Sequence, residues 1–215
     1  MRHDIDLSLY LVLDPDLCGG FEGMVRTSRI AAQNGATVVQ LRAPAWKKRE
    51  LVECGRAVKS VLDPLNVPLI INDHADVCLA VDAAGLHVGQ KDLAPCDARA
   101  IIGPDKVLGL SVSNLEQLSK VDTTLVDHLG IGPVFATATK KDAAPALGLD
   151  GFSRLARQKP CPVVAIGSVK ANLAQALIRS GADGLAVVSA ICGQPDIAFA
   201  TRNLKDAVET ARKAT

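Results

Sequence analysis

Short apolar runs recur along the whole chain, and most of them are rich in Val, Leu and Ile. Eight runs have this character, at residues 8–13, 37–41, 69–71, 85–88, 107–112, 128–131, 163–166 and 184–188. Each run is bounded by glycine, proline or polar residues, which is typical of short buried β-strands. The pattern therefore predicts eight strands that are covered on both faces.

Segments with helical spacing lie between these runs. Apolar residues within 51–62 recur on one helix face, and those within 173–182 do the same. Strict alternation of strands and helices gives a parallel sheet, and eight such units close into a (β/α)8 barrel of about 200 or more residues. We therefore predict an α/β fold in which residues 1–215 form a single TIM-barrel domain.

A doubly wound open sheet is the alternative architecture for the same alternation. Such a sheet normally carries a G-x-G-x-x-G turn after its first strand, and none follows Leu13. The pair Gly19-Gly20 lacks the context of that motif. Because no proline-rich linker or break in composition divides the chain, the pattern favours one closed barrel.

Composition agrees with a large aliphatic core. Hydrophobic residues make up 48% of the 215 positions, whereas aromatic residues make up only 3%. The core must therefore be built from Val, Leu, Ile and Ala, which suits buried parallel strands covered by helices. Lys plus Arg number 24 and Asp plus Glu 23, so no global charge recruits nucleic acid or a membrane surface.

Targeting and redox signals indicate a cytoplasmic protein. Residues 1–6 carry two acids and no apolar core of a signal peptide. No apolar stretch reaches the roughly 18 residues that a membrane span needs. The six cysteines show neither C-x-x-C nor a metal-type spacing, so we interpret them as reduced thiols.

Polar residues follow nearly every predicted strand. In a barrel, the loops after the strands form the rim that carries the active site. Two acids, two cations and two small Gly/Ser turns occur together at these positions, which is more than polar loops alone would give. The residues at the strand exits are Asp14, Gln40, Arg42, Asn72, Asp73, Gln90, Asp92, Ser111, Thr137, Thr139, Lys140, Gly167, Ser168, Val188 and Ser189.

Asp73 and Asp92 leave the ends of the third and fourth predicted strands. Mg²⁺ takes one or two carboxylates together with phosphate oxygens and water, so this pair predicts a magnesium site. Taken alone, Asp73 could equally be the N-cap of a helix that begins at His74. The second acid at the neighbouring exit favours the metal.

The remaining strand exits suggest binding of anions. Arg42 offers a planar fork for phosphate oxygens and Lys140 a point charge. Residues 132–148 form a long strand-to-helix connection, which is commonly functional, although a mobile solvated loop is the alternative. Turns at 167–168 and 188–193 follow the last two strands, where barrels often bind phosphate with backbone N–H groups and a short helix.

His87 lies inside a predicted strand and is interpreted as a buried residue or a partner of a site residue, not as a catalytic base. His3, His74 and His128 show no metal-type spacing. No Ser-His-Asp order or reactive cysteine context occurs, so covalent nucleophilic catalysis is not expected.

Several motifs together resemble the thiamine phosphate synthase family over about residues 9–205. The combination of Gly89-Gln90-Lys91-Asp92 with the segment from Gly132 to Lys140 is highly specific. The other motifs that carry the resemblance are at 10–15, 39–42, 71–73, 109–111, 164–167 and 187–191.

The resemblance implies a transferase that joins a pyrimidine methyl diphosphate to a thiazole phosphate and releases pyrophosphate with Mg²⁺. By position, Asp73 and Asp92 would hold the metal. The residues implied to contact the pyrimidine diphosphate are Gln40, Arg42, Asn72, Ser111 and Lys140, with Arg42, Ser111 and Lys140 as catalytic residues. Those implied to bind the thiazole phosphate are Thr137, Thr139, Gly167, Ser168, Val188 and Ser189.

Two positions depart from the family pattern. Pro44 stands where the family has a lysine, so one cation for the diphosphate is missing unless Lys47, Lys48 or Lys91 supplies it. Ser168 replaces the second glycine of a Gly-Gly turn.

Two further functions remain open on this sequence. One is a thiazole tautomerase type that keeps the barrel without the transferase, and the other is a non-catalytic barrel that binds thiamine precursors. The partners expected are small molecules, with neither nucleic acid nor membrane. The oligomeric state is not indicated, and a homo-oligomer is one alternative.

Overall fold

The computed structural model describes residues 5–137 and 144–214, and its eight parallel strands close into one barrel in chain order. The strands are β1 Leu9–Leu13, β2 Val38–Leu41, β3 Leu69–Asn72, β4 Gly85–Val88, β5 Val107–Val112, β6 His128–Ile131, β7 Val163–Ala165 and β8 Gly184–Val187. Strand β1 pairs with both β2 and β8, which completes the closure. The predicted TIM barrel is therefore confirmed and the open sheet is excluded.

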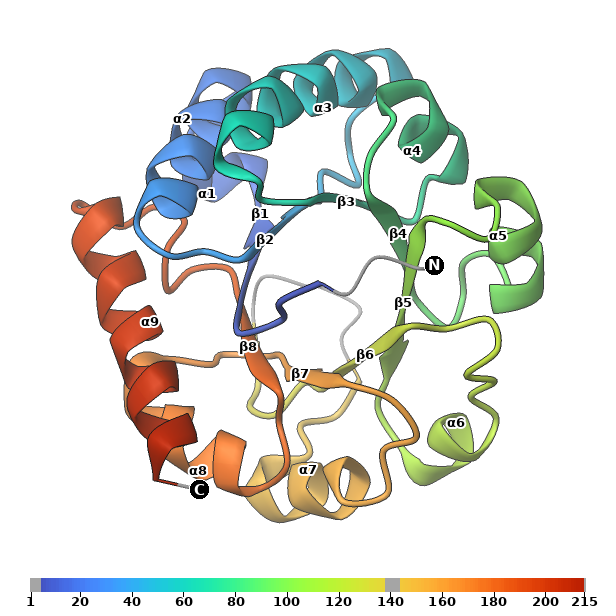
Figure 1. Ribbon diagram of the computed structural model, residues 1–215, viewed down its shortest axis with the longest axis vertical. Coiled ribbons are helices and arrows are strands. Elements are labelled where there is room, and N and C mark those ends of the chain that lie inside the picture. The colour runs from blue at the N-terminus through green and yellow to red at the C-terminus, as the bar shows by residue number, and fades with distance from the viewer. Residues whose placement is uncertain (1–4, 138–143, 215) are drawn as a thin grey trace.

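Helices form a ring outside the strands (Figure 1). They are α1 Pro15–Cys18, α2 Gly20–Gln33, α3 Lys48–Leu62, α4 Ala75–Val81, α5 Pro95–Ile102, α6 Leu115–Ser119, α7 Gly148–Ala156, α8 Ala174–Arg179 and α9 Ile197–Lys213, with short 3-10 turns at Asp63–Leu65 and Ala171–Leu173. The predicted helical face at 51–62 lies in α3. The one predicted at 173–182 corresponds to α8, which ends at Arg179. Among the helices of the described ranges, none is long and apolar enough to cross a membrane.

Side-chain caps begin several of these helices. Asp14 Oδ1 accepts the N–H of Leu17 at 3.0 Å at the start of α1, and Asp196 Oδ1 accepts the N–H of Phe199 at 2.8 Å at the start of α9. Such bonds satisfy backbone donors that lack a partner in the first helical turn. Asp14, which follows β1 at the rim, therefore has a local structural role.

The buried residues form two clusters. The larger cluster lies between the strands and the helices, and Leu11, Leu86 and Phe152 are among its fully buried members. The smaller cluster contains inward-facing residues of the strands, including Tyr10, Val38 and Val164. This division is the one expected when a barrel interior is filled by side chains instead of forming a pore.

A repeated clasp joins each odd strand to the following even strand near their N-terminal ends. The residue before the even strand donates its N–H to a carbonyl of the odd strand, at 2.8–2.9 Å, in the pairs Thr37–Leu9, Ala84–Leu69, Asp127–Leu108 and Asp183–Val163. In three of these pairs there is a second bond, because a side-chain oxygen accepts the N–H of the odd-strand residue, at 2.7–3.0 Å. The acceptors are Thr37, Asp127 and Asp183. Ala84 has no side-chain acceptor for this second bond.

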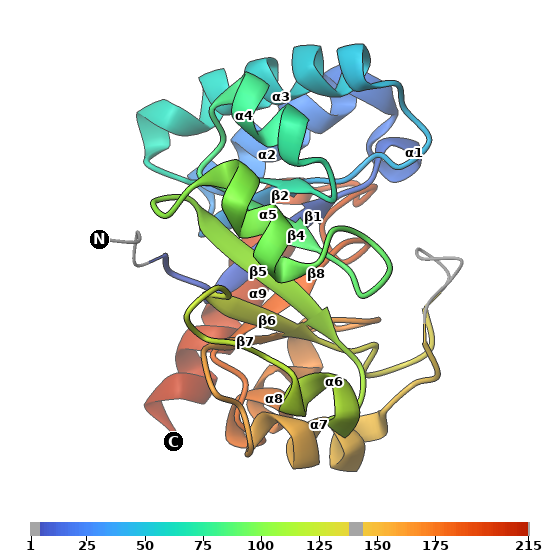
Figure 2. The same ribbon diagram turned by 90° about the vertical axis from the view of Figure 1, so that its right-hand side faces the viewer.

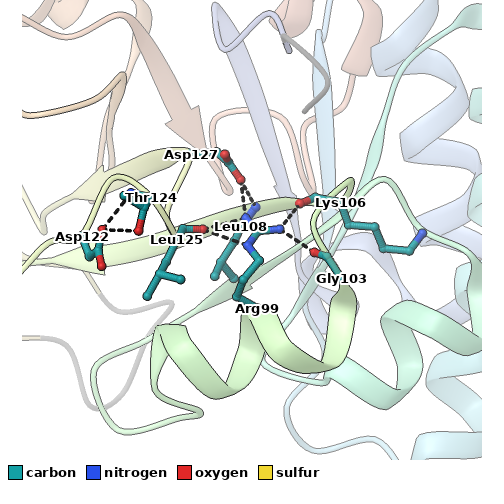
Figure 3. A network of polar contacts seen from close by, with 8 residues as sticks. All are labelled: Arg99, Gly103, Lys106, Leu108, Asp122, Thr124, Leu125 and Asp127. Atoms are coloured by element: carbon teal, nitrogen blue, oxygen red, sulfur yellow. Dashed lines mark hydrogen bonds and ion pairs between the residues drawn. The ribbon is translucent and has the colours of Figure 1, made fainter. Parts of the chain in front are cut away.

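Arg99 adds a buried network to the clasp between β5 and β6 (Figure 3). Its guanidinium donates to the Asp127 carboxylate at 2.7 Å and to three backbone carbonyls, those of Gly103, Lys106 and Leu125. The network lies at the N-terminal ends of the strands, where barrel residues contribute to stability and not to catalysis.

Candidate active site

The predicted site residues within the described ranges lie at the C-terminal ends of the strands. Figure 2 shows the barrel from the side, and the arrowhead of β5 marks the C-terminal end of that strand. The residues gathered at this rim are Gln40 in β2 and Arg42 after it, Asn72 in β3 and Asp73 after it, Asp92 after β4, Ser111 in β5, Thr137 after β6, Gly167 and Ser168 after β7, and Val188 and Ser189 after β8. Thr139 and Lys140 lie outside the described residues.

Asp73 sits in a tight turn directly after β3. The N–H of His74 donates to the Asn72 carbonyl at 2.7 Å, and Asp73 has a left-handed backbone with φ of 60°. A non-glycine residue in that region is strained by roughly 1–3 kcal/mol, and such strain clusters at functional sites. The N–H of Asp73 also donates to the His87 carbonyl at 2.8 Å, which places Asp73 beside the end of β4.

The alternative role of Asp73 as a helix cap is wrong. His74, not Asp73, occupies the N-cap position of α4, and the His74 side chain makes no cap hydrogen bond. The Asp73 carboxylate instead accepts the Asn72 side-chain amide at 2.5 Å. The turn therefore holds an amide and a carboxylate together at the rim.

Asp92 closes the loop after β4. Its carboxylate accepts the N–H of Gly89 at 2.9 Å, and its own N–H donates to the Gly89 carbonyl at 3.3 Å. The side chain is exposed to solvent. Asp92 thus follows β4 while Asp73 is hydrogen-bonded to the end of the same strand, so both acids belong to the β3–β4 side of the rim.

The donor set at this side of the rim suits Mg²⁺. Within residues 5–137 and 144–214, no group of three or more His, Cys, Asp or Glu side chains is placed to hold a metal ion. A magnesium site of two carboxylates completed by phosphate and water does not require such a group. A carboxylate has about four lone-pair sites, so a carboxylate that accepts a hydrogen bond, as Asp73 does from Asn72 and Asp92 from Gly89, can still be a metal ligand.

The β2 exit presents one buried and one partly exposed polar side chain. Gln40 is 4% exposed, and its side-chain amide donates to the Tyr10 hydroxyl at 2.8 Å. Burial raises the pKa of the Tyr10 phenol, so the hydroxyl stays protonated. Arg42 follows β2 and is half-buried. Gln40 is therefore fixed by a partner inside the barrel, whereas Arg42 lies at the rim.

The β5 exit is held by residues from β4. His87 Nε2 and Ser111 Oγ are 2.9 Å apart, and the Gln90 side-chain amide donates to the Ser111 carbonyl at 2.7 Å. His87 is buried, with 9% exposure. The predicted burial of His87 is therefore confirmed, and the residue that it contacts directly is Ser111, a predicted site residue.

The loops after β6 and β7 are joined to each other. The N–H groups of Val134 and Phe135 donate to the carbonyls of Ile166 and Gly167, at 2.8 and 3.2 Å. A Cβ at Gly167 would lie 2.6 Å from Pro133 Cα, so only glycine permits this approach. Ser168 has φ of 52°, and its hydroxyl donates to the Ala136 carbonyl at 2.6 Å.

The β8 exit forms a hydrogen-bonded turn. The N–H groups of Ile191 and Cys192 both donate to the Val188 carbonyl, at 3.0 and 2.8 Å. The short helix expected at this position is therefore a single turn, and α9 begins only at Ile197. Val188 is half-buried and Ser189 is exposed at the start of the turn.

The position after β2 at which the family pattern has a lysine and this chain has Pro44 is exposed to solvent. Pro44 is exposed, as are Lys47, Lys48 and Lys91. Lys48 pairs with Asp76 of α4 at 2.5 Å, and this hydrogen bond lowers the pKa of the Asp76 carboxyl. Lys48 is thus already engaged by an acid, which favours Lys47 or Lys91 over Lys48 as a substitute cation.

Sequence reasoning missed the part that Tyr10 and His128 play beneath the rim. Tyr10 contacts Gln40, and the ring of His128 lies between those of Tyr10 and His87. The signal was present, because Tyr10, Gln40, His87 and His128 interrupt otherwise aliphatic strands. Their inward direction could be assigned only once the strand register was known.

The closed barrel, with polar side chains at the C-terminal ends of its strands, is the architecture of TIM-barrel enzymes, which carry their active sites at that end. The family model described as thiamine monophosphate synthase matches residues 9–191. The chain belongs to this family.

Individual relatives extend the match to almost the whole chain. A protein from Azorhizobium caulinodans named thiamine-phosphate synthase is 49% identical over 213 residues, covering 99% of this chain and 100% of the relative. One of the same name from Laribacter hongkongensis is also 49% identical, over 95% of this chain and 96% of the relative. A solved structure, the thiamine phosphate pyrophosphorylase from Pyrococcus furiosus, has a TM-score of 0.86 at 32% identity, covering 96% of this chain and 97% of that one.

Proposed function

We propose that the chain is a thiamine-phosphate synthase, a transferase that joins an aminopyrimidine methyl diphosphate to a thiazole phosphate and releases pyrophosphate. The full-length match to proteins of that name carries the proposal. The arrangement of polar groups around the rim supports it, because two anionic substrates need two separate sets of donors. We assign these sets to the β2–β5 side and the β6–β8 side of the rim.

The pyrimidine diphosphate is assigned to the β2–β5 side. Gln40 and Ser111 offer polar groups that are already oriented by Tyr10 and His87, and Asn72 lies beside Asp73. Arg42 supplies a planar fork for the diphosphate oxygens. Lys140 is assigned to the same substrate by the family resemblance alone, since it lies outside the described residues.

Asp73 and Asp92 are assigned as ligands of Mg²⁺. When bound, the metal would neutralise negative charge on the departing pyrophosphate. The strained turn at Asp73 and the closed loop at Asp92 fix the two acids on neighbouring strand exits before any ligand arrives. This pre-organisation avoids an ordering cost on binding.

The thiazole phosphate is assigned to the β6–β8 side. Gly167 and Ser168 bring a tight turn against the β6 exit, and the Ser168 hydroxyl is occupied by the Ala136 carbonyl. The contribution of Ser168 to a phosphate would therefore be its backbone N–H and not its side chain. Thr137, Val188 and Ser189 complete this set among the described residues, and Thr139 belongs to it by resemblance.

The reaction proposed is a dissociative displacement of diphosphate. The ring nitrogens of an aminopyrimidine delocalise the cation that remains when the diphosphate leaves. Arg42, with Lys140, stabilises the leaving group, and the β6–β8 residues hold the thiazole nitrogen in line for attack. No residue has to remove a proton in the bond-forming step, which agrees with the role of His87 as a partner of Ser111.

We place the enzyme in the cytoplasm, since its cysteines carry no spacing typical of a disulfide framework.

The decisive experiment incubates the purified protein with both substrates and Mg²⁺ and measures thiamine phosphate. Product that requires all three components supports the proposal, and plain and carboxylated thiazole phosphates are compared as acceptors. Conversion of the thiazole substrate alone would indicate a tautomerase instead, and binding without product would indicate a non-catalytic barrel.

A further inference from the structure

Two imidazole rings fill the interior of the barrel over a glycine. His87, Gly109 and His128 are in register on the adjacent strands β4, β5 and β6. A Cβ at Gly109 would lie 2.4 Å from His87 Nδ1 and 2.5 Å from His128 Nε2. No larger residue fits at this position, so the glycine leaves the space in which the two rings meet.

A third ring continues this arrangement across the barrel. The ring centroids of Tyr10 and His128 are 5.9 Å apart, and those of His87 and His128 are 5.6 Å apart, with interplanar angles of 46° and 40°. Both distances fall in the range of favourable tilted ring contacts. Tyr10, His128 and His87 therefore form a buried three-ring stack in which His128 is the central member.

Each outer ring of the stack is hydrogen-bonded to a residue that we assign to the pyrimidine diphosphate. Tyr10 bonds Gln40 at 2.8 Å, and His87 bonds Ser111 at 2.9 Å. The stack thus connects the β2 exit to the β5 exit through the barrel interior. At the other side of the rim, Gly167, Ser168 and Ser189 are hydrogen-bonded to Phe135, Ala136 and Gln194.

His128 itself makes no hydrogen bond in the described part of the chain. Both of its ring nitrogens are buried without a partner, and burial lowers its pKa to about 4. The ring is therefore neutral near pH 7 and contributes through shape and ring contacts. A buried polar group that lacks a partner calls for an explanation beyond stability.

We propose that His128 is a positioning residue, whose ring holds Tyr10 and His87 so that Gln40 and Ser111 face the pyrimidine substrate. The proposal rests on the proposed function, because Gln40 and Ser111 are assigned to that substrate there. It extends that function to a residue that lies below the rim at the start of β6. His128 touches neither substrate and acts only through its two neighbours in the stack.

The test is a steady-state comparison of His128→Leu with the wild type, varying each substrate in turn. Removing the ring should raise KM for the pyrimidine diphosphate by on the order of ten-fold, the change expected when one or two oriented hydrogen bonds are lost. KM for the thiazole phosphate should stay within about two-fold. His128→Phe, which restores a ring, should recover most of the affinity for the pyrimidine diphosphate.

Two further variants distinguish a selective change in KM for the pyrimidine diphosphate from a general loss of stability. Phe152→Leu removes a fully buried ring from α7, outside the interior cluster, so it should lower stability without a selective change in KM. Tyr10→Phe keeps the stack and removes only the hydroxyl that bonds Gln40. This conservative variant should fold and still raise KM for the pyrimidine diphosphate.

Equal changes of both KM values in folded His128→Leu would overturn the proposal, as would a Tyr10→Phe enzyme with wild-type constants. A wild-type protein that forms no thiamine phosphate would instead refute the proposed function. The two failures are therefore distinguished by the wild-type assay alone.

Discussion

Replacing Arg99 with methionine should destabilise the barrel without altering its chemistry. The Arg99 and Asp127 side chains are only 10% and 16% exposed. Methionine keeps much of the aliphatic volume of arginine but removes every donor, so the buried ion pair with the Asp127 carboxylate is broken. Breaking a buried pair in this way costs about 3–5 kcal/mol, which for a chain of this size lowers Tm by on the order of 10 °C.

The measurement is reversible denaturant unfolding followed by circular dichroism, with activity assayed well below Tm. A matched control is Lys120→Met, because the Lys120–Glu116 pair has side chains that are 70% and 78% exposed. Exposed pairs of this kind contribute at most about 1 kcal/mol. An Arg99→Met protein no less stable than Lys120→Met would refute the reasoning, as would loss of turnover in a fully folded variant.

Three other predictions concern the rim and the interior. Asp92→Asn should lower turnover by at least about 100-fold with an unchanged Tm, and EDTA should abolish wild-type activity; full activity after EDTA treatment would contradict the metal assignment. Arg42→Ala should weaken binding of the pyrimidine diphosphate in calorimetry while leaving the thiazole phosphate affinity nearly unchanged, and the reverse result would show that the rim is divided wrongly. The pKa of His128 is lowered from 6.5 to about 4 in the folded protein, so its contribution to stability is complete above pH 6.5 and is lost as pH falls toward 4. Unfolding measurements should show up to about 3 kcal/mol of this loss, and His128→Phe should lack it.

The fold could be predicted because buried parallel strands leave a strong local signal. All eight apolar runs became strands, with ends that differ by at most one residue from the predicted ranges. Parallel topology then places every strand exit on one rim, so the gathering of Asp73, Asp92 and Ser111 on one rim followed from sequence. The roles of these residues remain predictions, and the family match supports them without testing each one.

Features that depend on contacts between distant segments could not be predicted. The Ser168 hydroxyl bonds a carbonyl on another loop, and Lys48 bonds Asp76 of the next helix. The three-ring stack needs the register of four strands before its members can be placed. Asp73 is a local example of the same limit, because the sequence allowed a helix cap at this position and only the backbone geometry shows a tight turn with His74 at the N-cap position.

The clasps at the N-terminal ends differ among the four quarters of the barrel, where a quarter is an odd strand with the even strand that follows it. Three quarters hold the first residues of their odd strand through two bonds, one to its N–H and one to its carbonyl, whereas the β3–β4 quarter relies on the Ala84 N–H alone. The β3–β4 quarter is also the one that carries Asp73 and Asp92 at its other end. The acids assigned to the metal are therefore held by the turn and loop bonds at the rim, without the second clasp bond that the other three quarters have below it.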